Sequence, residues 1–69
     1  MKTTQEALQE AIEAAEKLAT ALQDVNLAAN KENTPQGALI SLIITNKIKE
    51  AMNIKIETTL ALHAYNNEI

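Results

Sequence analysis

"AANKENTPQG", residues 28–37, contains the only proline and the only glycine of this 69-residue chain. Thr34 followed by Pro35 is a favourable helix start, because threonine caps free backbone N–H groups and proline fits the first helical position. The asparagines before it favour a turn. Since a turn of a few residues between two long helices is typical of antiparallel neighbours, this stretch predicts an αα-hairpin with its turn at residues 31–34.

Upstream of the turn, the hydrophobic periodicity predicts a helix over about 4–30. Thr3 and Glu6 have the spacing of a capping box. Apolar or small side chains then recur at alternating steps of four and three residues, which is the heptad pattern of a helix that packs along one stripe. From this stripe we predict the first half of an intramolecular core: Leu8, Ala11, Ala15, Leu18, Leu22 and Val25.

This helix is unusually rich in alanine. One series is spaced four residues apart (Ala7, Ala11, Ala15, Ala19) and another seven residues apart (Ala14, Ala21, Ala28). The first interpretation is that alanine is simply the best helix former. The second is that small side chains allow close packing on two sides of the helix.

Downstream of the turn, the pattern predicts a second helix over about 35–66. Its core face supplies the rest of the predicted core: Ile40, Ile44, Ile48, Ile54 and Leu62. An alternative is a break near residue 53, because "NIKIET", residues 53–58, alternates apolar and polar side chains as a strand does.

A second group of apolar residues points away from this core face: Leu39, Leu42, Met52, Ile56 and Leu60. One neighbouring helix can cover only one face of another. A lone core also stabilises a chain below about 70–80 residues only weakly. We therefore expect these five residues to form a self-association interface with copies of the chain, so that the hairpin is stabilised by assembly. A folded monomer with exposed apolar residues is the alternative.

Charge and hydropathy argue against several classes of partner. The net charge is −3, and the basic residues are six lysines without any arginine, which does not suit nucleic-acid binding. No apolar run approaches the about 20 residues that a membrane span needs. The polar start "MKTTQEALQE" does not resemble a Sec signal. We expect either a cytoplasmic protein or one exported by a dedicated machine.

Residues that carry chemistry are scarce. The chain has no cysteine, and His63 is its only histidine, with no carboxylate at helical spacing. Acid–base catalysis needs a poised partner and a pocket. We therefore expect no enzyme, no metal site and no cofactor. Lys47 and Lys55 lie on or beside the predicted core face, where they either extend into solvent or pair with acidic residues of another copy.

Composition indicates a structural role. Ala, Asn, Thr and Gln make up 30 of 69 residues, and the only aromatic residue is Tyr65. This make-up is similar to that of exported helical filament subunits such as flagellins and type III secretion needle subunits, and the length and the Pro-containing turn also resemble a needle subunit. The resemblance covers architecture and composition, and it carries over no residue-level motif.

Two functions follow from these observations. The first is a self-assembling helical protomer of a filament, tube or bundle. The alternative is a small helical adaptor, immunity or regulatory protein, including a phage-borne one, that binds another helical protein through its exposed apolar face.

Overall fold

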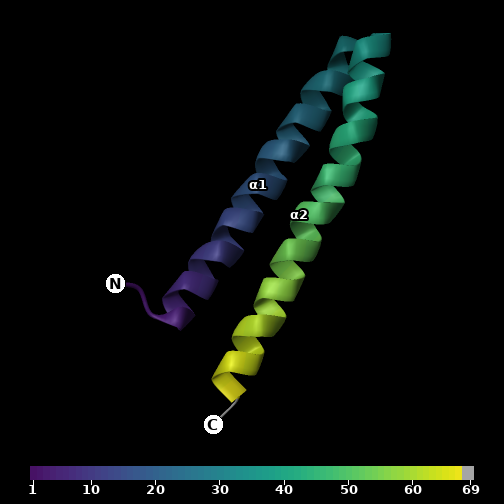
Figure 1. Cartoon of the computed structure of the whole chain (residues 1–69). Helices are drawn as coiled ribbons and strands as arrows, with labels where there is room; N and C mark the ends of the chain where they lie inside the picture. The colour runs from purple at the N-terminus through teal and green to yellow at the C-terminus, as the bar shows by residue number, and fades with distance from the viewer. Residues whose placement is uncertain (68–69) are drawn as a thin grey trace.

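The computed structural model describes residues 1–67 and shows an antiparallel pair of α-helices (Figure 1). Helix α1 spans Thr4–Glu32 and α2 spans Pro35–Asn67, and no strand occurs among the described residues. The start of α1 and the end of α2 lie at the same end of the hairpin. The molecule measures 54 × 20 × 13 Å, and its radius of gyration of 15.8 Å exceeds the about 11 Å of a compact domain of this length. The expected all-α hairpin is confirmed.

Helix α1 begins with the predicted capping box. The Thr3 hydroxyl accepts a hydrogen bond from the Glu6 backbone N–H at 3.1 Å, and a Glu6 carboxylate oxygen accepts one from the Thr3 N–H at 3.1 Å. Each side chain thus satisfies a backbone donor that has no partner within the helix.

The turn is shorter than predicted, because only Asn33 and Thr34 separate the helices. Asn33 ends α1 in the left-handed conformation, with φ 54° and ψ 44°, which asparagine tolerates better than most residues. Thr34 then caps α2 as expected, since its hydroxyl accepts a hydrogen bond from the Gly37 N–H at 2.9 Å. Two residues therefore suffice to reverse the chain.

The contact between the helices consists mainly of small residues. Ala15, Ala29 and Ala51 are the buried hydrophobic residues of the described chain, and Gly37 is buried with them. Larger side chains in this contact are only half-buried: Leu8, Ile12 and Leu22 of α1, and Ile44, Ile48 and Leu62 of α2. We call this contact the first seam. It recurs at alternating steps of four and three residues, as in a coiled coil.

At the turn end of the first seam, the helices approach too closely for a side chain at residue 37. A β-carbon there would collide with the carbonyl oxygen of Ala29. Further along, Asn26 and Ser41 meet across the seam, where the Ser41 hydroxyl donates a hydrogen bond to the Asn26 side-chain oxygen at 2.5 Å. A polar pair inside an apolar seam fixes its register, so these contacts define how the helices align.

Helix α2 continues through Asn53, so the alternative of a break at that position does not hold. The strand-like alternation of residues 53–58 is overridden because the first seam continues on both sides of it, through Ala51 and Leu62. Lys55 lies between these residues and reaches Glu16 of α1, with 3.5 Å between Nζ and Oε2.

Five residues of the predicted core are exposed and require correction: Ala11, Leu18, Val25, Ile40 and Ile54. The other six, Leu8, Ala15, Leu22, Ile44, Ile48 and Leu62, lie in the first seam. Two heptad stripes of α1 share Leu8, Ala15 and Leu22 and differ at the positions between these residues. The predicted stripe contains the bulkier side chains of Leu18 and Val25, whereas in the hairpin Ala19 and Asn26 face α2. The close approach at Gly37 and the Asn26–Ser41 bond favour the smaller set.

Candidate interaction surfaces

The five exposed residues of the predicted core gather on one side of the hairpin. Two residues that meet in the contact between antiparallel helices each have a preceding neighbour in their own helix. These two preceding residues point to the same side of the helix pair. Val25 precedes Asn26 and Ile40 precedes Ser41, and Asn26 contacts Ser41. By the same rule Leu18 and Ile54 fall on this side, which we call the apolar side. Leu18 is 48% exposed and Val25 is 42% exposed.

On α1 the apolar side continues into a complete second heptad stripe. Its members recur at steps of four and three residues and are all exposed: Ala7, Ala11, Ala14, Leu18, Ala21, Val25 and Ala28. We call this stripe the second seam. At about 100° per residue it is rotated by roughly a quarter turn from the first seam. Helix α1 therefore carries two heptad stripes, of which the hairpin covers one.

The back of α2 is a separate apolar surface. Leu39, Leu42, Met52, Ile56 and Leu60, the predicted self-association residues, are each at least half exposed, up to 66% at Leu42. In the described part of the chain these side chains keep at least half of their surface exposed, and their role as an interface between copies stays a prediction.

The side opposite the apolar side is more polar. Glu16, Thr20, Gln23, Met52 and Lys55 line a shallow groove of about 190 Å3 beside the first seam, floored by Ala15 and Ala19. The Lys55–Glu16 ion pair lies in this groove within one chain. On the apolar side itself, Lys47 pairs with Glu50 of α2 at 3.4 Å, because these two residues precede Ile48 and Ala51 of the first seam. Exposed pairs of this kind contribute little stability.

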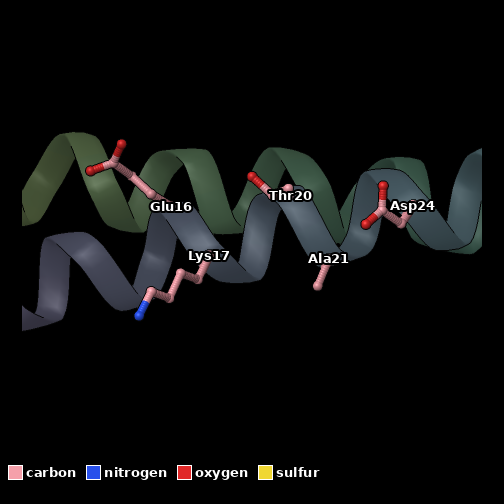
Figure 2. A pocket seen from close by; sticks show the side chains of 5 residues that line it. All are labelled: Glu16, Lys17, Thr20, Ala21 and Asp24. Atoms are coloured by element: carbon pink, nitrogen blue, oxygen red, sulfur yellow. The ribbon is translucent and has the colours of Figure 1, made fainter.

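A larger hollow of about 340 Å3 lies on the surface of α1 (Figure 2). Its residues are Glu16, Lys17, Thr20, Ala21 and Asp24, all from this one helix. Figure 2 shows Lys17 and Ala21 extending from the same side of α1. Because a single helix provides every wall, this hollow does not enclose a ligand.

The structure brings together no metal-binding cluster among the described residues. His63 is exposed on α2. Among residues 1–67, no three His, Cys, Asp or Glu side chains lie close enough to hold a metal ion. Neither α1 nor α2, as far as they are described, is long and apolar enough to cross a membrane.

The fold alters the ionisation of Glu6. Hydrogen bonds from the Thr3 backbone N–H and the Thr3 hydroxyl lower the pKa of the Glu6 carboxyl below its ordinary value of 4.5. The cause is local, since these bonds favour the charged carboxylate. This group stabilises the start of α1 and does not form part of a pocket.

Comparison with known proteins yields no relative: no family model, no curated protein and no solved structure matches this chain. The apolar side with its second seam and the back of α2 are therefore the features of this chain that bear on its function.

Proposed function

We propose that this protein is a structural protomer that assembles with copies of itself through the apolar surfaces that the hairpin leaves exposed. The observation that carries the proposal is the exposure of large apolar side chains on both helices, including Leu18, Leu42 and Leu60. Contiguous apolar surface of this kind marks interaction sites in soluble proteins.

The total exposed area supports this proposal. The chain exposes 5344 Å2. A compact monomer of 7.5 kDa would expose about 4,200 Å2. The excess of roughly 1,100 Å2 is comparable to the about 800 Å2 that each partner buries in a standard interface. Burial of this excess would stabilise a hairpin whose own core consists largely of alanine.

The two apolar surfaces face different directions, because the second seam lies on α1 and the other surface lies on the back of α2. A chain with two separate surfaces can bind a different copy through each. Contacts of this kind extend an assembly unless its geometry closes into a ring. The arrangement favours a growing assembly over an isolated pair.

The experiment compares Leu42→Lys and Leu60→Lys with the unaltered protein by sedimentation velocity at matched concentrations. Gln9→Lys is the control, because it adds the same charge to an exposed site of α1 that belongs to none of these surfaces. We expect both leucine variants to sediment as smaller species while their helix content by circular dichroism stays unchanged. The control should assemble as the unaltered protein does.

Two results would count against this function. Loss of helix content in the leucine variants would mean that these side chains stabilise the hairpin itself. An unaltered protein that forms only a closed dimer, with no change in the leucine variants, would favour the adaptor function, in which the back of α2 binds a different protein.

A further inference from the structure

We infer that the second seam of α1 binds the second seam of another copy in antiparallel orientation, with Ala21 at the two-fold axis. This inference rests on the proposed self-assembly and specifies one of its contacts. Its occupant is a second copy of this chain.

The second seam has the pattern of a helix-pairing surface. It keeps the heptad spacing from Ala7 to Ala28 without a charged residue. Leu18 and Val25 supply its bulky side chains, and Ala14, Ala21 and Ala28 lie within one helical turn of them. Alternating large and small residues let two helices interdigitate at short distance.

Charge determines the orientation. A row of charged residues borders the second seam on its outer edge, one residue per heptad with alternating sign: Glu10, Lys17, Asp24 and Lys31. In an antiparallel pair with full overlap, Lys17 of each copy lies opposite Asp24 of the other, and Glu10 lies opposite Lys31. A parallel pair in register would place like charges together. Among pairs with full overlap, the row is therefore complementary to itself in the antiparallel orientation, whereas a parallel pair would match its charges only after a shift of one heptad.

This alignment also matches the apolar residues. The charge pairs place the two-fold axis between Lys17 and Asp24. Leu18 of one copy then lies opposite Val25 of the other. Ala14 then lies opposite Ala28, and Ala21 lies opposite its own copy. Charge and apolar packing thus select the same register. Glu10 also binds Lys2 of its own chain, at 2.7 Å through Oε1, and its second oxygen remains for Lys31 of the other copy.

The same two-fold axis brings the α2 helices of the two copies side by side. The second seam lies on the apolar side of the hairpin, where Ile40 and Ile54 are also exposed. Pairing of the α1 helices therefore brings these isoleucines between the α2 helices, with the Lys47–Glu50 ion pair between them along α2. The result is a four-helix unit that covers the whole apolar side and leaves the back of α2 available for further copies.

Cysteine cross-linking tests this arrangement, since the natural chain contains no cysteine. Ala21→Cys places each thiol opposite its own copy, within the about 7 Å between Cα atoms that a disulfide requires. Under mild oxidation we expect this variant to form covalent dimers. Ala14→Cys and Ala28→Cys should each remain uncross-linked alone and form dimers when the two proteins are mixed.

Three other outcomes would contradict the second-seam contact or the proposed function. Cross-linking of Ala14→Cys by itself would overturn the antiparallel register. Absence of cross-links in all three variants, while light scattering still shows assembly, would overturn the second-seam contact but not the proposed function. Absence of both cross-links and assembly would overturn both.

Discussion

Gly37 permits the close packing of the two helices at the turn. Its backbone is ordinary helix with negative φ, where alanine would normally be favoured over glycine by about 1 kcal/mol. Here a β-carbon would meet the Ala29 carbonyl oxygen. The steric effect and the helix propensity therefore act in opposite directions, and the sign of the stability change shows which one is larger.

We expect Gly37→Ala to lower the free energy of unfolding by about 1–3 kcal/mol, as overpacking does in tight contacts. The neighbouring Gln36→Ala is the control, because residue 36 is exposed in the same helical turn and its change should be neutral or slightly stabilising. Urea unfolding followed by circular dichroism measures both. A Gly37→Ala variant at least as stable as the parent would show that the helices are not held this close.

Glu6 makes the start of α1 sensitive to acid. Its folded-state pKa lies below its unfolded value because Thr3 donates hydrogen bonds to the carboxylate. A group with a lowered pKa stabilises the fold above its unfolded pKa, and this contribution is lost as the pH falls through the lowered value. We expect helix content to decrease below about pH 5, and Glu6→Gln to remove this part of the decrease. An NMR titration that placed the Glu6 pKa at or above 4.5 would contradict the capping geometry.

Single residues were well predicted where the chemistry is local. Thr3, Glu6, Thr34 and Pro35 act at positions that depend only on nearby backbone groups, so the caps could be read from spacing. The turn has two residues instead of the predicted four, because Asn33 adopts a positive φ and ends α1 directly before Thr34. The close approach at Gly37 could not be inferred, because it depends on the alignment of two distant segments.

At the level of the helices, α1 has two adjacent stripes with the same heptad period. Periodicity correctly located the helix but could not decide which stripe faces α2, because Leu8, Ala15 and Leu22 fit both choices. The deciding contacts, Asn26 with Ser41 and Ala29 with Gly37, involve both helices. A polar asparagine at a seam position was the available signal, since such residues specify register in coiled coils.

This placement of the two stripes predicts different losses of stability for two leucines of α1. Leu22 is half-buried in the first seam, whereas Leu18 is 48% exposed on the second seam. We expect Leu22→Ala to destabilise the hairpin by about 2 kcal/mol and Leu18→Ala by less than about 1 kcal/mol. Unfolding measured at low protein concentration, where association contributes least, tests both. A larger loss at Leu18 would restore the original core assignment.

The alternating charges of α1 predict a specific pattern of rescue. Lys17→Glu and Asp24→Lys each place like charges opposite one another in the antiparallel pair. Two reversed contacts should weaken self-association about tenfold at low salt. An equimolar mixture should recover association, because Glu at 17 then faces Lys at 24. Analytical ultracentrifugation would detect this recovery, and a mixture no stronger than either variant would exclude the charge pairing.

At the level of the whole molecule, the sequence predicted the hairpin, and it also predicted that one helix partner could not cover all the apolar residues. The back of α2 was located from its position opposite the core face, and Leu39, Leu42, Met52, Ile56 and Leu60 are exposed as that position implies. The apolar side was missed, because its members were assigned to the intramolecular core. The extended shape, with a radius of gyration of 15.8 Å, follows from two long helices that bury mostly alanine.

The most direct test of self-assembly is the molar mass in solution, measured by light scattering over a hundredfold range of concentration. The exposed apolar side and the back of α2 predict a mass that rises with concentration well beyond that of two chains. A constant mass of 7.5 kDa across the whole range would contradict self-assembly, because the apolar surfaces of the hairpin would then remain exposed without binding another copy.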